Sequence, residues 1–255
     1  MNAKVDFRLH DPDPTAVNAL YGAYELLCRY HRHRVVGMEH IPTSGRCVLA
    51  VNHSFATYDN GILVRSILRE TGRLVRPLGD RSLFYVPAFG KWLGKTGTAP
   101  ARPHVAEHLL ENEEALVLVA PGGMREALRP STEKYQVRWN TRKGFVRLAL
   151  KTRSPIILSA CPDADDLYTV YENSLTKLVY RRARLPLVAF RGFGPTLVPR
   201  PVELTHYLSE ALEPPEVDAN DPEAFEAAVE RWHAELTELM NTMLDDYRRA
   251  DAIDT

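Results

Sequence analysis

The sequence predicts an α/β fold, with a mostly parallel central sheet flanked by helices and further helices near the N-terminus and at the C-terminus. Two observations predict it: short, fully apolar runs typical of buried parallel strands, and helical apolar patterns that alternate with them. The expected strands are residues 47–51, 74–78, 115–120, 156–160 and 187–190, and the helices between them lie near residues 60–69, 103–111 and 141–151.

Two outer helices complete this pattern. Asp13-Pro14-Thr15 is typical of a helix start, and apolar and aromatic residues follow at helical spacing up to a basic end at residues 29–34. This helix either packs on the core or lies in a membrane interface. Asn220-Asp221-Pro222 predicts the start of a long final helix, whose apolar stripe either packs on the domain or forms a dimer seam or partner contact. The stripe consists of Phe225, Val229, Trp232, Leu236, Leu239 and Met243.

The length of 255 residues suits one large domain that can bury a sizeable core. Hydrophobic residues make up 45% and charged residues 25%, which excludes a chain that is disordered throughout. We expect a single domain (1–255) of three parts: an N-terminal amphipathic helix (1–34), a catalytic α/β core (35–202) and an acidic C-terminal helical region (203–255).

The net charge of -1 is a sum over unlike parts. Residues 61–153 carry 17 basic and 8 acidic side chains, a balance of +9, whereas residues 203–255 carry 3 and 15, a balance of -12. The basic part suits an anionic substrate or a membrane surface. A nucleic-acid partner is disfavoured, because the basic residues are not interleaved with exposed aromatics and no recognition motif is present.

The sequence also bears on compartment. Cys28, Cys47 and Cys161 are far apart and odd in number, so neither a disulfide framework nor a metal site is expected. The N-terminus has acids and prolines where a signal peptide needs an apolar core. Its apolar runs are too short for a transmembrane span. We therefore expect a cytoplasmic protein that associates peripherally with a membrane.

The first candidate for chemistry is Asn52-His53-Ser54-Phe55-Ala56-Thr57-Tyr58-Asp59, directly after the apolar run 47–51. Functional groups of α/β folds lie at the carboxyl ends of strands. A histidine whose imidazole is held by a carboxylate at one ring nitrogen can take a proton from a hydroxyl at the other. His53 and Asp59 are therefore a candidate general base and its orienting carboxylate.

The second candidate is Pro121-Gly122-Gly123-Met124-Arg125-Glu126, after the expected strand 115–120. The two glycines allow a tight turn and a close approach of the backbone to a ligand. Arg125 would then be a fixed cation for a phosphate or an oxyanion. The alternative is a strand-ending loop with a surface pair between Arg125 and Glu126.

Together with the segments 36–42 and 142–150, these motifs resemble the glycerolipid acyltransferase superfamily of lysophosphatidic acid acyltransferase-like proteins. The sequences PGGMREAL (121–128) and RKGFVRLAL (142–150) are most similar to its diacylglycerol acyltransferase 2-like and TMEM68-like branch. The resemblance covers residues 35–160. It implies an acyltransferase that moves a fatty acyl group from acyl-CoA, or from acyl carrier protein, to a lipid hydroxyl: a lysophospholipid, diacylglycerol or long-chain alcohol.

The resemblance also implies roles for individual residues. His53 would deprotonate the acceptor hydroxyl, Asp59 would orient the imidazole, and Gly122, Gly123 and Arg125 would bind the oxyanion or a phosphate. Arg102, Glu126 and Lys143 are candidates for acceptor or donor binding. No cofactor and no metal are expected, and the expected partners are acyl-CoA, a lipid acceptor, a membrane surface and, through the C-terminal helix, a second copy of the chain.

One departure from the family pattern leaves an alternative open. The usual block is HxxxxD, whereas His53 and Asp59 enclose five residues. Either the turn absorbs the extra residue, or Asp59 does not orient His53. In the second case the chain is a catalytically inactive protein that binds lipid or acyl-CoA on the same fold.

Overall fold

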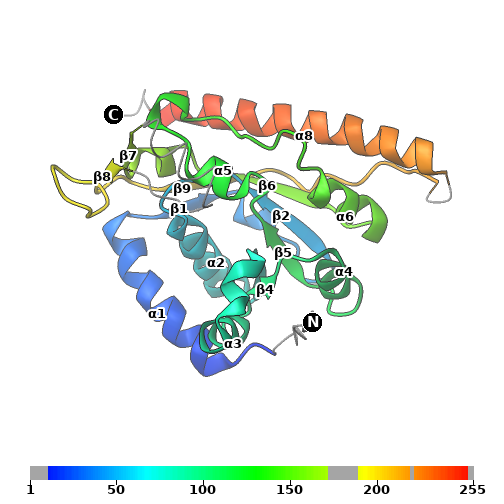
Figure 1. Cartoon of the computed structure of the whole chain (residues 1–255), viewed down its shortest axis with the longest axis horizontal. Helices are drawn as coiled ribbons and strands as arrows, with labels where there is room; N and C mark the ends of the chain where they lie inside the picture. The colour runs from blue at the N-terminus through cyan, green and yellow to red at the C-terminus, as the bar shows by residue number, and fades with distance from the viewer. Residues whose placement is uncertain (1–10, 172–188, 219–220, 252–255) are drawn as a thin grey trace, which may run out of the picture.

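The structure is a computed structural model that describes residues 11–171, 189–218 and 221–251. At its centre lies a seven-stranded sheet in the order β1-β9-β6-β2-β5-β3-β4 (Figure 1). All neighbouring strands are parallel except β6 and β9, so the expected mostly parallel sheet is confirmed. The strands are β1 (Arg34–Val36), β2 (Cys47–Val51), β3 (Val75–Gly79), β4 (Ala99–Pro100), β5 (Leu116–Val119), β6 (Ile156–Ala160) and β9 (Thr205–Leu208).

Helices cover both faces of the sheet (Figure 1). One apolar cluster joins α1 and α2 to one face, and another joins α4, α6 and α8 to the opposite face. The α-helices are α1 (Pro14–Tyr30), α2 (Tyr58–Thr71), α3 (Pro87–Lys95), α4 (Pro103–Glu111), α5 (Gly123–Ala127), α6 (Gly144–Thr152) and α8 (Pro222–Asp251). Short 3-10 helices are η1 (Met38–His40), η2 (Arg81–Tyr85), η3 (Ser131–Glu133) and η4 (Pro162–Asp166).

Strand β2 shows why the apolar runs are continuous rather than alternating. All five of its side chains are buried. Cys47, Leu49 and Val51 belong to the cluster with α1 and α2, while Val48 and Ala50 belong to the cluster with α4, α6 and α8. A strand covered on both faces needs an apolar residue at every position, which is the pattern that made β2 and β6 predictable from sequence.

Residues predicted to start helices do so. The Asp13 carboxylate accepts hydrogen bonds from the backbone N–H groups of Thr15 (2.9 Å) and Ala16 (3.4 Å), which caps α1. The Asp221 carboxylate accepts from Glu223 and Ala224, both at 3.0 Å, at the start of α8. Both caps satisfy helix N–H groups that have no partner within the helix.

The apolar stripe of α8 packs against the core of the same chain. Val229, Trp232, Leu236 and Met243 are buried in the core cluster, whereas Leu239 is 36% exposed. Packing on the domain, one of the two alternatives for this helix, is therefore what the structure shows. A dimer through the same stripe would require α8 to leave the domain.

The structure differs from the sequence-based expectations in several elements. Thr205–Leu208 form β9 of the central sheet, although residues 203–255 were expected to be helical. Of the expected strand 187–190, residues 187 and 188 lie outside the described residues. Phe190 begins β8 (Phe190–Arg191), which pairs with β7 (Thr169–Val170) in a separate two-stranded sheet. β1 and β4 were not expected, since two or three residues form too short a pattern for a strand. The nine-residue helix α3 was not expected either.

Candidate active site

The candidate site lies at the carboxyl ends of β2 and β5, which are neighbours in the parallel sheet. His53 and Pro121 each lie two residues beyond the end of their strand. Asn52 fixes the first of these ends, because its side-chain amide donates to the carbonyl of Cys161 at 3.1 Å and accepts from the N–H of Cys161 at 2.8 Å. The loop after β2 is thereby tied to the residue that follows β6.

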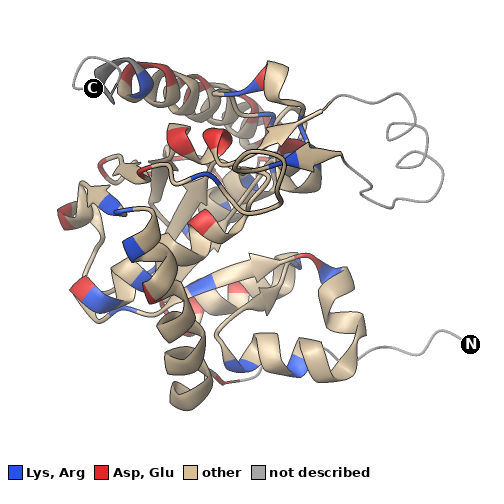
Figure 2. Ribbon diagram, turned by 90° about the vertical axis from the view of Figure 1, so that its left-hand side faces the viewer, with Lys and Arg blue, Asp and Glu red and all other residues tan. Residues whose placement is uncertain are grey.

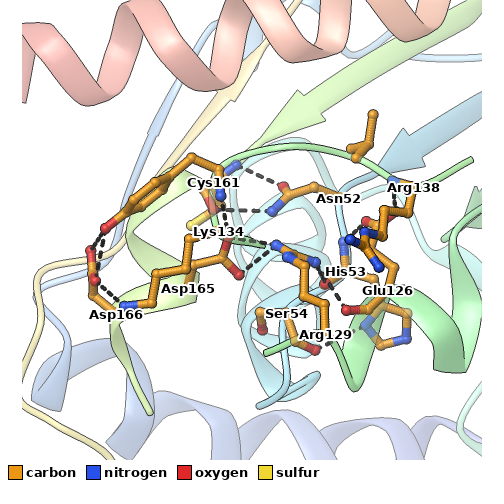
Figure 3. Close-up of polar contacts among 12 residues, drawn as sticks. Asn52, His53, Ser54, Glu126, Arg129, Lys134, Arg138, Cys161, Asp165 and Asp166 are labelled. Atoms are coloured by element: carbon orange, nitrogen blue, oxygen red, sulfur yellow. Dashed lines mark hydrogen bonds and ion pairs between the residues drawn. The ribbon is translucent and has the colours of Figure 1, made fainter. Parts of the chain in front are cut away.

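The backbone of His53 is held on both sides by charged side chains (Figure 3). Its N–H donates to Oε1 of Glu126 at 2.6 Å, and its carbonyl accepts from Nη1 of Arg129 at 2.6 Å. The residue is only 8% exposed. These two hydrogen bonds fix the position of the His53 backbone, and the residue lines the cavity described below.

The imidazole has one hydrogen bond that determines its tautomer. Nδ1 of His53 lies 3.1 Å from the carbonyl oxygen of Ser54. A carbonyl can only accept, so Nδ1 carries the proton and Nε2 carries the lone pair. This is the form that a general base needs.

Asp59 lies behind Ser54 and makes no direct hydrogen bond to His53. Its carboxylate is fully buried, and Oδ1 accepts from the Ser54 hydroxyl at 2.8 Å. Oδ2 is buried without a hydrogen-bond partner. Ser54 lies between the two residues: its hydroxyl contacts the Asp59 carboxylate and its carbonyl contacts the His53 imidazole.

Burial disfavours the charged form of both His53 and Asp59 and therefore shifts their pKa values in opposite directions. It lowers the pKa of His53 to about 4, although the hydrogen bond to Ser54 opposes the shift. It raises the pKa of the Asp59 carboxyl to about 6, and the Ser54 hydroxyl and the first N–H groups of α2 counteract that rise. At pH 7 His53 is therefore neutral and Asp59 is ionised.

Glu126 and Arg129 belong to a buried charged network (Figure 3). Oε2 of Glu126 accepts from the N–H of Arg138 at 2.7 Å, and burial raises the pKa of this carboxyl. Nη2 of Arg129 contacts both oxygens of Asp165 at 2.5 Å, and both side chains are almost fully buried. Glu126 is therefore not the partner of a surface Arg125, but a support for the His53 backbone.

A cavity of about 400 Å³ lies beside His53, and most of its lining side chains are apolar. It is bounded by α1, α2, β3 and the start of α5, with Tyr24 and Val64 among its walls. Gly61 on α2 lets α1 approach closely, because a Cβ at this position would lie 2.3 Å from the Tyr24 ring. The cavity suits a lipid chain more than a polar metabolite.

A second cavity of about 280 Å³ adjoins the first and shares Leu78, Ala101 and Ala120 with it. Arg102 and Arg142 line this second cavity. Two guanidinium groups beside an apolar cavity form a place where an anionic group could bind.

The Pro121-Gly122-Gly123 turn is approached closely by side chains of the chain itself. A Cβ at Gly122 would lie 1.9 Å from Oε2 of Glu126, and one at Gly123, where φ is +49°, would lie 2.6 Å from Nη1 of Arg142. The Gly123 N–H donates to the Ala120 carbonyl at 3.0 Å, so the turn itself uses this donor. Gly123 lines the cavity beside His53.

Two predicted site residues lie apart from this arrangement. Arg125 is exposed on α5 and is not among the residues that line either cavity. Lys143 forms an ion pair with Glu230 of α8, and Arg147 pairs with Glu226. Part of the basic middle of the chain is therefore neutralised by the acidic C-terminal helix.

The chain matches the Acyltransferase family over residues 32–161, about half of its length. It belongs to the Acyltransferase family. The matched residues include His53 and Asp59 and the buried network of Glu126 and Arg129. The expected superfamily and enzyme class are thereby confirmed.

Similar proteins support this assignment. A bovine protein named DGAT1/2-independent enzyme synthesizing storage lipids is 26% identical over 231 residues, which cover 88% of this chain and 67% of the bovine one. Its human counterpart is 27% identical over 184 residues, covering 72% of this chain and 54% of the human one. This acyltransferase thus spans between about half and two thirds of these relatives.

A solved structure confirms the fold. The crystal structure of the 1-acyl-sn-glycerophosphate acyltransferase PlsC from Thermotoga maritima superposes with a TM-score of 0.57 over 91% of this chain and 79% of the other, at 14% sequence identity. At this identity the likeness concerns the α/β architecture, including the flanking helices, and not the substrate.

Sequence reasoning missed Ser54 and the pair of Arg129 and Asp165 as parts of the site of this acyltransferase. Ser54 stands inside the first motif, and the unusual His53–Asp59 spacing was the signal that something must fill the gap. Arg129 and Asp165 are 36 positions apart and carry no local pattern, so only the fold brings them together.

Proposed function

We propose that this acyltransferase transfers a fatty acyl group from an acyl thioester, such as acyl-CoA, to the hydroxyl of a lipid at a membrane surface. The observation that carries the proposal is a neutral, buried His53 with a free Nε2, beside an apolar cavity. A hydrophilic acceptor would gain no favourable apolar contacts in such a cavity, whereas a lipid alcohol would bury its chain there. The names of the bovine and human relatives, which refer to storage lipids, agree with this class of product.

In this mechanism Nε2 of His53 takes the proton of the acceptor hydroxyl as its oxygen attacks the thioester carbonyl. The tetrahedral intermediate then collapses with cleavage of the carbon–sulfur bond. The departing thiolate takes the proton from the imidazolium, so His53 ends neutral and no acyl-enzyme is formed. The Ser54 carbonyl accepts from Nδ1 of the imidazolium, and the charge of the nearby buried Asp59 carboxylate, held by the Ser54 hydroxyl, favours the transient positive charge.

The second cavity supports a phosphate-bearing substrate. Arg102 and Arg142 would contact a phosphate of the donor or of the acceptor, next to the apolar cavity that takes the chain. Arg142 also holds the Gly122 carbonyl, so its guanidinium is already oriented. Arg125 stays a candidate for the oxyanion only if α5 moves when substrate binds, because its side chain is exposed in the free protein.

No helix within the described ranges has both the length and the apolar character needed to cross a bilayer. In the proposed reaction a lipid acceptor enters the apolar cavity beside His53 from a membrane surface.

The test is the variant His53→Ala, supplied with acyl-CoA and a mixture of lysophospholipid, diacylglycerol and long-chain alcohol. Ester formation is measured by mass spectrometry and release of CoA by a thiol-reactive dye. Loss of the base should lower the rate by about 10²- to 10⁴-fold. The matched control is His104→Ala, which removes an exposed histidine of α4 and should leave the rate unchanged.

Two results would contradict the proposal. Near-normal turnover by folded His53→Ala would exclude His53 as the base. A wild-type protein that binds acyl-CoA but yields neither ester nor free CoA with any acceptor would instead be the inactive binding protein that the His–Asp spacing left open.

A further inference from the structure

Apolar side chains are exposed on one continuous segment, η2 and α3, which we call the η2–α3 surface (residues 81–95). Within the described ranges other large apolar residues are also exposed, such as Phe193, Leu197 and Val198 after β8, but here five that are 40% to 58% exposed lie on a segment that also lines the cavity beside His53. They are Leu83, Tyr85, Val86, Phe89 and Trp92. An exposed apolar patch of this kind marks a place where the protein meets another molecule or a membrane.

The segment is rigidly built, so the exposure is not that of a loose loop. Gly90 of α3 packs on the backbone of Phe84 so closely that a Cβ would lie 2.9 Å from its Cα. The rings of Phe89 and Trp92 stack at 5.8 Å between centroids. The end of α3 is tied to α1, because the Asp13 N–H donates to the Lys95 carbonyl at 2.8 Å.

The charges of this surface favour one kind of partner. Residues 81–95 contain Arg81, Lys91 and Lys95 and no acidic residue. Lys95 contacts Asp13 at 3.4 Å, whereas Arg81 and Lys91 are exposed. Aromatic and aliphatic side chains flanked by basic ones suit the interface of a bilayer that contains anionic lipid. The acidic helix α8 lies at the opposite edge of the molecule (Figures 1 and 2).

The η2–α3 surface also reaches the cavity beside His53. Leu83 belongs to both, and Met124 of α5, which is 40% exposed, lines the same cavity. An apolar path therefore runs from the exposed surface to the imidazole. By contrast, inner residues of α1 such as Val17 and Tyr21 are buried against the core. Its exposed Leu26 and Tyr30 do not line the cavity beside His53.

We propose that the η2–α3 surface inserts into the interfacial region of an anionic bilayer and holds the cavity mouth against it, so that lipid passes directly to His53. This rests on the proposed function for its lipid substrate, but the binding itself can be tested without any turnover.

Trp92 provides a direct probe. The chain has three tryptophans, and the other two, Trp139 and Trp232, are buried. With vesicles of equimolar phosphatidylcholine and phosphatidylglycerol that carry brominated acyl chains, tryptophan fluorescence should be quenched and shifted to shorter wavelength. Trp92→Phe should still bind the vesicles but lose the quenching. Binding without quenching in the wild type would overturn the proposal.

The second test removes the apolar contacts. Phe89→Ser with Trp92→Ser should lower the fraction of protein that sediments with these vesicles by at least about tenfold, while thermal unfolding is unchanged. Phe193→Ser, which alters a 62% exposed aromatic residue just after β8, is the matched control and should bind as the wild type does. Lys91→Gln should weaken binding to anionic vesicles by about fivefold and leave binding to pure phosphatidylcholine vesicles unchanged.

The outcomes separate this inference from the proposed function. Wild-type vesicle binding by the Phe89→Ser/Trp92→Ser variant overturns the inference, whatever its activity. So does a lipid-free dimer of the wild type that this variant abolishes, because the surface would then be a contact between two copies. Vesicle binding through the surface by a protein that forms no ester supports the inference and contradicts the proposed function. With a water-soluble short-chain acceptor, the variant should retain the wild-type rate.

Discussion

The two sides of His53 differ. On the side of its backbone, charged side chains are buried and paired with one another. On the side of its imidazole, the cavity walls are mostly apolar and lead to an exposed surface. On the first side, Glu126, Arg129 and Asp165 leave little freedom of movement. On the second side, side chains such as Leu83 and Met124 are partly exposed. The difference teaches that His53, the proposed base, is positioned by buried charged groups, while the proposed lipid substrate would meet an apolar lining that is partly exposed.

The largest effect on stability is expected from removing one partner of the buried ion pair between Arg129 and Asp165. Asp165→Asn removes the charge that compensates Arg129 in the interior, which should lower the free energy of unfolding by about 3–5 kcal/mol. Urea denaturation measures it. The matched control, Glu230→Gln, breaks the exposed pair with Lys143 and should cost less than about 1 kcal/mol. Equal losses in the two variants would show that Arg129 is not held as described.

A smaller effect is expected for the link between Asp59 and His53. Ser54→Ala leaves Oδ1 of Asp59 without its donor, which should cost about 1–3 kcal/mol of stability. Asp59 makes no hydrogen bond to the imidazole, and Ser54→Ala keeps the backbone carbonyl that accepts from Nδ1 of His53. Both Ser54→Ala and Asp59→Asn should therefore lower kcat far less than His53→Ala. A loss for Asp59→Asn as great as that for His53→Ala would mean that the carboxylate contacts His53 directly during turnover.

The smallest effect concerns pH. Below about pH 6 the Asp59 carboxyl gains its proton, since burial raises its pKa, whereas His53 stays neutral down to about pH 4. The wild-type kcat/KM should therefore decline as pH falls through 6, because support for the imidazolium is lost. In Asp59→Asn the lower rate should stay level to about pH 4, provided that circular dichroism shows a folded protein. An acid limb at pH 6 in both proteins would assign the titration to another group.

The sequence predicted the parts of the fold in which every position is apolar and the site residues that directly follow them. β2 and β6 have the predicted bounds, and His53 and Gly123 border one cavity as their places after two strands suggested. β9 escaped prediction because Thr205 and His206 are polar although buried.

The orientation of the arginines could not be predicted either. Arg125 and Arg129 are four positions apart, which on a continuous helix would place them on one face. However, α5 ends at Ala127, and beyond it Arg129 turns inward while Arg125 stays in solvent. Arg129 is buried because Asp165, 36 positions later in the sequence, pairs with it, and a local sequence pattern does not reveal such a partner.

The contacts of α8 bear on when this site can form during synthesis. Asn241 of α8 accepts from the N–H of Val137 at 2.9 Å, across 104 positions of sequence. The next residue, Arg138, donates to Glu126, and Glu126 holds His53. Since a ribosome releases the chain from its N-terminus, the segment around His53 emerges long before the helix on which its support depends. We expect the nascent chain to carry an unfinished catalytic centre until α8 has docked, so that acyl transfer and the completion of folding begin together.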